Sequence, residues 1–346
     1  MVAAQSGQDG NFVQHEHYQG SRPAEGSIST RHVLLGDIGT TNARFALLTN
    51  GVLGPIKSFD VAGFARFIDE AAIFLKDHCQ QIEVGKAIFA VAGPIENERC
   101  VLTNCSWTID ARELREAFGL EASIVNDFEA VAVSLPSLVA SDVVKIGGGE
   151  PKPQAPMAVL GPGTGLGVAC LIPGLRKPVI VPSEGGHTTL AGTCDREDDI
   201  IKQLRRRFGH VSAERLVSGG GLENIYQAIV ALEGRALAPL NAVDTTKYAL
   251  RGDCQVAREA LETFCAFLGS CAGNVVLTFG ARGGAYIAGG ISPRILDFIA
   301  RSTFRDRFEA KGRFRPYLEA VPSYVIVHPA AAFVGLKWVA NLNPTS

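Results

Sequence analysis

Residues 34–48 read LLGDIGTTNARFALL, and this stretch decides the predicted fold. An apolar strand enters a turn that contains Asp37, Gly39 and Thr40, and a second apolar strand leaves that turn. Glycine lets backbone approach a ligand closely, and threonine hydroxyls and free backbone N–H groups can hold phosphate oxygens. An aspartate there can hold a hydrated Mg²⁺. The same residues also suit a tight β-hairpin that binds nothing, because hairpin turns use glycine and aspartate as well.

A second glycine cluster, GPGTGLG at residues 161–167, also lies between two apolar stretches. It does not fit the dinucleotide pattern GxGxxG, because the third spacing fails and a strand rather than a helix follows. It is not a P-loop, since no GKS or GKT follows it. The cluster fits a second phosphate hairpin facing the first, with a glycine-rich hairpin without a ligand as the alternative.

The run SIVNDF at residues 123–128 delivers Asn126 and Asp127 to the carboxyl end of a predicted strand. In α/β sheets this is the edge where ligands bind. A carboxylate placed there can accept the proton of an alcohol as the alcohol attacks phosphorus. Alternatively, Asp127 is the N-cap of the helix that follows.

Two further segments indicate ligand contacts, with the hydroxyls of a sugar in the first and with adenine in the second. In PSEGGH, at 182–187, Glu184 and His187 flank two glycines and can hydrogen-bond neighbouring hydroxyls. In HVSAERLVSGGGL, at 210–222, Ser212 is a predicted helix N-cap, Glu214 is a first-turn acid favoured by the helix dipole, and the glycine run can let a flat adenine lie against the backbone. Zinc is the competing reading of PSEGGH, but no cysteine pair with ligand spacing lies nearby.

The totals exclude several classes of protein. With 33 basic and 35 acidic residues the net charge is -2, which gives no sign of a nucleic-acid arm. The eight cysteines form no CxxC pair and are expected to be buried free thiols of a cytoplasmic protein. Residues 1–28 are polar and aperiodic, so we expect a disordered leader. The apolar stretches 153–175 and 263–281 favour core elements over membrane spans.

Hydrophobic periodicity predicts alternating strands and helices after residue 32. Both halves begin with strand, glycine-rich turn and strand, which indicates a duplicated topology and an α/β fold of two domains with a cleft between them. The expected strands are 32–37, 43–49, 86–92, 100–103, 122–126, 156–160, 167–172, 284–288 and 323–327. The expected helices are 63–78, 110–118, 128–134, 196–208, 212–216, 221–232, 243–248, 253–278, 293–302 and 330–340.

Taken together and in order, the motifs resemble those of the bacterial glucokinase family, which are ATP-dependent hexose kinases of the actin-like ATPase superfamily. The resemblance runs from about Val33 to about Ala340 and rests on GDIGTTNAR, VAGPI, TNCSW, IVNDFEAV, GPGTGLGVA, PSEGGH, GHVSAERLVSGGGL, FGARGGAYIAGGI and YVIVH. Thr40 stands where many members have a second glycine. The cysteine-rich zinc motif of the related repressor and sugar-kinase group is missing.

The resemblance implies an actin-like (hexokinase/ribonuclease H-like) fold with a small domain at 29–137, completed by the C-terminal segment 328–346, and a large domain at 138–327. It implies a glucokinase that makes glucose 6-phosphate for glycolysis, with ATP and Mg²⁺ as cofactors. We expect a cytoplasmic homodimer that binds neither nucleic acid nor a membrane. The rival hypotheses are a kinase for another hexose, a sugar-sensing regulator without turnover, and an actin-like ATPase without a small substrate.

The resemblance also assigns roles position by position. Asp127 matches the catalytic base, and the glucose-binding positions are Asn126, Asp127, Glu184, His187 and Glu214. Asp37 is expected to hold Mg²⁺ through water. The positions expected to contact ATP are Gly36, Asp37, Ile38, Gly39, Thr40, Thr41, Asn42, Gly161, Gly163, Thr164, Gly165, Gly219, Gly289 and Gly290.

Overall fold

A computed structural model describes residues 32–79, 82–102, 105–174 and 177–342, and these residues belong to one compact unit. The predicted leader at 1–28 lies outside the described residues, as do Thr103 and Asn104 of the TNCSW motif. The predicted domain boundaries at 29–137, 138–327 and 328–346 stay a prediction.

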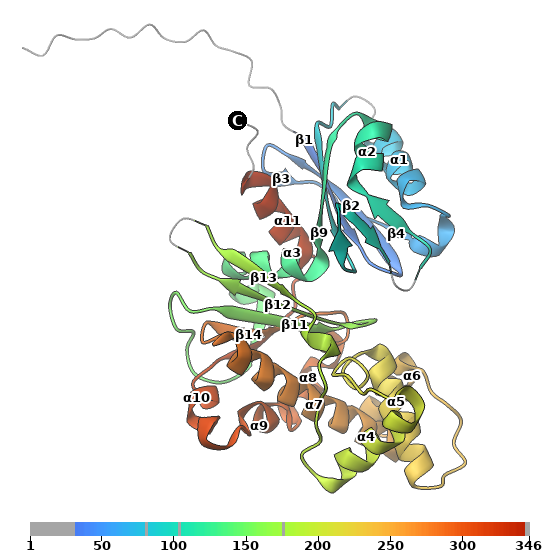
Figure 1. The fold of residues 1–346 in the computed structure, drawn as a ribbon, viewed down its shortest axis with the longest axis vertical. Helices are drawn as coiled ribbons and strands as arrows, with labels where there is room; N and C mark the ends of the chain where they lie inside the picture. The colour runs from blue at the N-terminus through green and yellow to red at the C-terminus, as the bar shows by residue number, and fades with distance from the viewer. Residues whose placement is uncertain (1–31, 80–81, 103–104, 175–176, 343–346) are drawn as a thin grey trace, which may run out of the picture. The chain divides into compact units, whose positions relative to one another are not determined.

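The first sheet is built on the hairpin that the opening motif predicts. Its strand order is β3-β2-β1-β5-β9, with β4 also pairing with β2 (Figure 1). The hairpin β1–β2 is antiparallel, whereas β5 and β9 run parallel to β1. The strands are β1 His32–Ile38, β2 Asn42–Thr49, β3 Val52–Leu53, β4 Lys57–Asp60, β5 Lys86–Val91 and β9 Glu121–Asn126. A small separate sheet contains β6 Ile95–Glu96, β7 Arg99–Val101 and β8 Thr108–Asp110.

The second sheet repeats this arrangement. Its order is β10-β15-β14-β11-β12-β13, in which β11–β12 is the antiparallel hairpin and β14 and β15 follow in parallel. The duplication of topology predicted from the two glycine-rich turns is therefore confirmed. The strands are β10 Val143–Gly147, β11 Met157–Pro162, β12 Leu166–Ile172, β13 Val179–Ser183, β14 Gly284–Ile287 and β15 Ser323–Ile326.

Helices cover both faces of each sheet, because alternate side chains of the strands are apolar on both faces. On the first sheet, α1 and α2 pack on one face and α3 and α11 on the other (Figure 1). The helices are α1 Phe67–His78, α2 Ala111–Phe118, α3 Asp127–Ser134, α4 Asp195–Phe208, α5 Gly219–Leu232, α6 Ala242–Arg251, α7 Gln255–Phe279, α8 Leu296–Arg301, α9 Phe304–Glu309, α10 Arg315–Glu319 and α11 Ala331–Leu342.

Helix α3 belongs to the cores of both sheets. Ala130 packs with Leu35 and Ile88 of the first sheet, whereas Ala132 packs with Val159 and Ala169 of the second. The N-terminus of this helix is therefore fixed by both sheets at once. That position matters for the site, because Asp127 is its first residue.

Helix α7 is the one helix of the described residues that is long and apolar enough to cross a membrane. However, 78% of its most apolar window is buried inside the protein, so it is a core helix here, as the sequence predicts. The cysteines are free, and Cys79, Cys100, Cys170, Cys265 and Cys271 are buried as expected, whereas Cys194 is exposed.

Two helix predictions were wrong. Residues 212–216 form turns rather than a helix, and Ser212 makes an isolated β-bridge with Thr189 instead of capping. The helix expected at 293–302 is divided into a 3₁₀ turn at Ser292–Ile295 and the short helix α8. Strands β3, β4, β6, β8 and β10 and helices α9 and α10 were not predicted.

Candidate active site

The two predicted phosphate hairpins face each other. The turn between β1 and β2 carries Thr40, and the turn between β11 and β12 carries Thr164. The Oγ1 atoms of these two threonines are 3.4 Å apart, although 124 positions separate them in the chain. The backbone N–H of Gly219, at the start of α5, donates to the carbonyl of Gly163 at 2.9 Å. Three of the expected nucleotide-binding segments therefore meet at one place.

The glycines expected to contact ATP are of two physical kinds. A Cβ on Gly163 or Gly290 would meet no protein atom within 4 Å, so these positions leave space for a ligand. A Cβ on Gly36 would lie 2.5 Å from the ring of Phe89, and one on Gly289, whose φ is +82°, would lie 2.3 Å from the carbonyl oxygen of Pro162. Glycine is required by packing at Gly36, and by both packing and the left-handed backbone conformation at Gly289.

Asp127 lies where β9 meets α3. Asn126 is the N-cap of α3, and its Oδ1 accepts hydrogen bonds from the N–H groups of Phe128 and Glu129 at 2.9 and 3.3 Å. The alternative reading of Asp127 as the cap is therefore wrong. The Oδ1 of Asp127 accepts a hydrogen bond from the N–H of Phe128 at 2.9 Å. Among the described residues no hydrogen bond reaches its Oδ2, which leaves this oxygen available to a substrate.

The environment of Asp127 raises the pKa of its carboxyl to about 7. The main cause is desolvation by burial, followed by the negative charge of Asp37, with a smaller contribution from Glu184. The N–H of Phe128 opposes this rise. A carboxylate with such a pKa is a much stronger base than an ordinary aspartate and is still ionised in part at neutral pH. Because the charges of Asp37 and Glu184 act on this carboxyl, the first phosphate hairpin and the PSEGGH segment both lie near Asp127.

Asp37 lies at the end of β1, opposite Arg44 in the antiparallel register. Arg44 forms an ion pair with Oδ2 of Asp37 and donates a second hydrogen bond to the carbonyl of Pro329 at 2.9 Å. No hydrogen bond from a described residue reaches Oδ1 of Asp37. One carboxylate oxygen beside a phosphate hairpin suits Mg²⁺, which takes one or two carboxylates and leaves its other positions to water and phosphate. No group of three or more His, Cys, Asp or Glu side chains within the described ranges could hold a metal ion.

Three of the five expected sugar ligands, Glu184, His187 and Glu214, form one group. His187 Nε2 lies 3.7 Å from Glu184 Oε2, and His187 Nδ1 lies 4.0 Å from Glu214 Oε1. The Oε2 of Glu214 accepts a hydrogen bond from the N–H of Leu166 at 3.0 Å, and its backbone N–H donates to Gly186 at 2.8 Å. Glu214 is therefore held by the second hairpin and not by a helix of its own. Glu184 and His187 remain largely exposed, at 73% and 58%, so they are accessible to a ligand.

Sequence reasoning missed two residues that shape this site. The ring of Phe128 lies against Gly161 and Gly167, which are directly opposite each other in the β11–β12 hairpin. Arg44, which holds Asp37, was quoted only as part of a motif. For Phe128 the sequence did carry a signal. Gly161 and Gly167 lie on either side of a short turn, and this spacing predicts that they are cross-strand partners.

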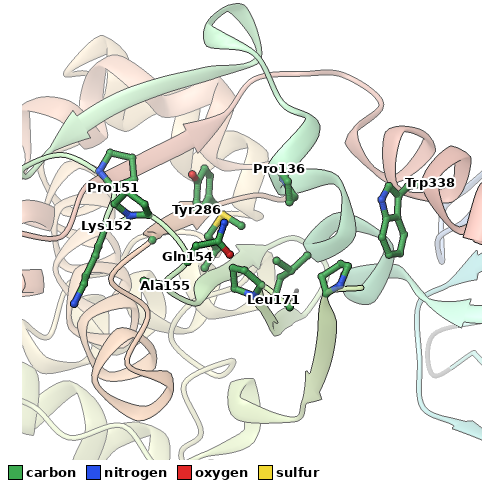
Figure 2. Close-up of a pocket in the computed structure, with 14 residues that line it drawn as sticks. Pro136, Pro151, Lys152, Gln154, Ala155, Leu171, Tyr286 and Trp338 are labelled. Atoms are coloured by element: carbon green, nitrogen blue, oxygen red, sulfur yellow. The ribbon is translucent and has the colours of Figure 1, made fainter. Parts of the chain in front are cut away.

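A separate pocket of about 400 Å³ is not this site. Figure 2 shows it lined by Pro136, Leu171, Tyr286 and Trp338 among others. Leu171 pairs with Met157, at the end of the β11–β12 hairpin remote from the phosphate turn. Since no predicted site residue lines it, we assign neither sugar nor nucleotide to this pocket.

The comparisons with known proteins agree with the site. A family model described as Glucokinase matches residues 34–343. A glucokinase of Paramagnetospirillum magneticum is 46% identical over 310 residues, which cover 88% of this chain and 96% of that protein. The crystal structure of a glucokinase from an Antarctic psychrotroph superposes with a TM-score of 0.79 at 35% identity, over 90% of this chain and 99% of that one.

A third match concerns the fold alone. The crystal structure of a glucokinase from Balamuthia mandrillaris in complex with glucose has a TM-score of 0.76 at 22% identity, over 92% of this chain and 96% of that one. Together these structural matches confirm the predicted fold class, a two-domain α/β fold of the sugar-kinase type.

Proposed function

Since the chain belongs to the glucokinase family, we propose that it transfers the γ-phosphoryl group of ATP to the 6-hydroxyl of glucose, with Asp127 as the general base. The observation that carries the proposal is the position of Asp127. Its carboxyl has one oxygen free of described partners and a pKa of about 7, beside two phosphate hairpins that face each other.

In the proposed reaction Asp127 accepts the proton of the 6-hydroxyl as that oxygen attacks phosphorus. Asn126 holds the strand end rigid, because its side chain both caps α3 and donates to the carbonyl of Gly93 at 3.2 Å. It is also a proposed glucose ligand, through the remaining donor of its amide. Glu184 and Glu214 accept hydrogen bonds from the other ring hydroxyls, and His187 accepts or donates one.

The ATP phosphates are proposed to lie between the turns at Gly39–Asn42 and Gly163–Gly165, where Thr40 and Thr164 present their hydroxyls. The N-terminus of α5 adds a favourable helix dipole, whereas the N–H groups of Gly219 and Gly221 are already used by Gly163 and Ser218. Mg²⁺, when bound, supplies neutralisation of phosphate charge, and Asp37 would hold it through water. Gly290 leaves space for the nucleotide at the second sheet.

The proposal also covers the setting of the enzyme. It includes a homodimer in the cytoplasm, glycolysis as the purpose, and glucose and ATP as the only partners needed for turnover. Movement of the segments that carry the two hairpins would exclude water from the γ-phosphate and so suppress hydrolysis of ATP.

A coupled assay of the purified protein tests the substrate. ATP and Mg²⁺ are supplied with glucose, mannose, fructose or N-acetylglucosamine, and ADP formation is followed for each. We expect the highest kcat/KM for glucose. A higher value for another hexose would contradict the assignment of glucose, and ADP formation that ignores every sugar would contradict a sugar kinase.

A further inference from the structure

Phe128 connects the candidate base to the second phosphate hairpin through one residue. Its backbone N–H donates to Asp127 Oδ1 and to Asn126 Oδ1, both at 2.9 Å. Its side chain packs against the hydrophobic cluster between α3 and the second sheet, which includes Val159 and Ala169. The backbone of Phe128 therefore belongs to the site of proton transfer, and its ring belongs to the sheet that carries the phosphate turn.

The ring of Phe128 lies against two glycines, which have no side chain to keep it away. Gly161 of β11 and Gly167 of β12 are direct cross-strand partners, one residue pair below the phosphate turn. A Cβ on Gly167 would lie 1.9 Å from Cδ2 of Phe128, and a Cβ on Gly161 would lie 2.8 Å from its Cζ. No L-residue other than glycine fits at Gly167 while the ring stays in place, because real Cβ contacts are never this short. We call this pair of glycines the glycine notch.

We propose that Phe128 is a positioning residue: its ring, seated in the glycine notch, fixes the distance between the carboxyl of Asp127 and the phosphate turn at Gly163–Gly165. This inference rests on the proposed function. The reason is geometric, since the proton acceptor and the phosphate donor come from different sheets and must be held in register for in-line transfer. A misplacement of about 1 Å between reacting groups can cost about 10²-fold in rate.

The notch also explains why the contact is made by an aromatic ring. A flat ring can lie against the exposed backbone of two opposed glycines, and it has few rotamers to lose on burial. A smaller apolar side chain would leave part of the notch empty and would allow α3 to shift against the hairpin.

The test is a double-mutant cycle on Gly167→Ala and Phe128→Ala. In the wild-type background Gly167→Ala forces the ring out of the notch, and we expect kcat with glucose to fall at least about 10-fold. In the Phe128→Ala background the atoms that the added methyl would meet, Cγ and Cδ2 of the ring, are gone, so the same change should lower kcat by less than about twofold. The dissociation constant for glucose should stay within about threefold in all variants, because neither residue is proposed to touch the sugar.

A matched control separates positioning from a general effect of glycine replacement. Gly85 precedes β5, lies on the surface, and has no atom within 4 Å of an added Cβ. Gly85→Ala should leave kcat, the glucose dissociation constant and the melting temperature unchanged. If Gly167→Ala does not fold, Phe128→Ala alone decides the matter, since it must lower kcat by about threefold or more while glucose binding is retained.

The outcomes that overturn the inference are distinct from those that overturn the function. If wild type phosphorylates glucose and Gly167→Ala lowers kcat equally in both backgrounds, the loss comes from the hairpin itself and Phe128 positions nothing. The same conclusion follows if the variants lose only melting temperature while kcat stays within about twofold. If wild type does not phosphorylate glucose, the proposed function fails and this inference fails with it.

Discussion

Glu70 gives a prediction on stability that does not depend on the enzyme's activity. It lies on α1 with no exposed surface, and neither carboxylate oxygen has a hydrogen-bond partner among the described residues. Burial, and secondarily the negative charge of Asp60, raises the pKa of Glu70 from 4.5 to about 7. In the unfolded chain the carboxyl is solvated and ionises near its ordinary pKa.

The sign of the pH dependence follows from proton binding. Between about pH 4.5 and pH 7 the folded protein keeps the proton of Glu70 whereas the unfolded chain has lost it. The folded state therefore binds more protons, and the free energy of unfolding falls as the pH rises through this window. Since each pH unit is worth about 1.4 kcal/mol, Glu70 should cost roughly 2 to 3 kcal/mol of stability between pH 5 and pH 8.

Glu70→Gln removes this dependence, because the amide does not ionise. The free energy of unfolding in urea should be measured for wild type and variant at pH 5 and pH 8. We expect the variant to gain roughly 2 to 3 kcal/mol in free energy of unfolding relative to wild type between the two pH values. Asp77→Asn, on the exposed side of the same helix, is the matched control and should gain almost nothing. A difference between Glu70→Gln and wild type that is equal at both pH values, or larger at pH 5, would refute the reasoning.

Three further predictions concern the site. The kcat/KM of wild type for glucose should rise with pH through about 7, because Asp127 must lose its proton to act as a base; a flat profile between pH 6 and pH 8 would contradict this. Asp37→Asn removes a negative charge that raises the pKa of Asp127, so the rise in kcat/KM should move to lower pH. Because Asp37 is also proposed to hold Mg²⁺, the Mg²⁺ concentration for half-maximal rate should increase. Glu184→Gln should lower kcat/KM for glucose about 10-fold or more, since a sugar hydroxyl loses a charged partner, while the KM for ATP should change less than about threefold. An equal effect on both substrates would place Glu184 outside the sugar site.

The sequence was most informative where the chemistry is local. The hairpins β1–β2 and β11–β12, with turns of few residues, follow from adjacent apolar stretches and glycine-rich turns. The position of Asp127 follows as well, because an apolar strand and a helix signal meet at that residue. These elements need no information from distant parts of the chain.

The errors occurred where distant contacts decide the structure. Residues 212–216 carry helix signals, but the N–H of Glu214 bonds Gly186 and its carboxylate bonds the N–H of Leu166. These tertiary bonds hold the segment in turns and override its local preference. Strand β10 could not be predicted for a related reason, since its partner β15 lies about 180 positions later.

The arrangement of the site was likewise hidden in distant contacts. Arg44 reaches the carbonyl of Pro329, 285 positions away, and Phe128 meets the two glycines of the other hairpin. Motifs indicate which residues are candidates for the site. The positions that hold those residues in place become visible only when the two sheets are seen together.

The central claim is that Asp127 is the general base of a glucokinase, and Asp127→Asn tests it most directly. Since Asn126 and not Asp127 caps α3, and since an amide oxygen can still accept from the N–H of Phe128, the variant should fold with an unchanged melting temperature.

The measurement is kcat for glucose phosphorylation together with the glucose dissociation constant. We expect kcat to fall by about 10²–10⁴-fold while glucose binding changes less than about threefold. A folded Asp127→Asn protein that phosphorylates glucose within about threefold of the wild-type rate would contradict the claim.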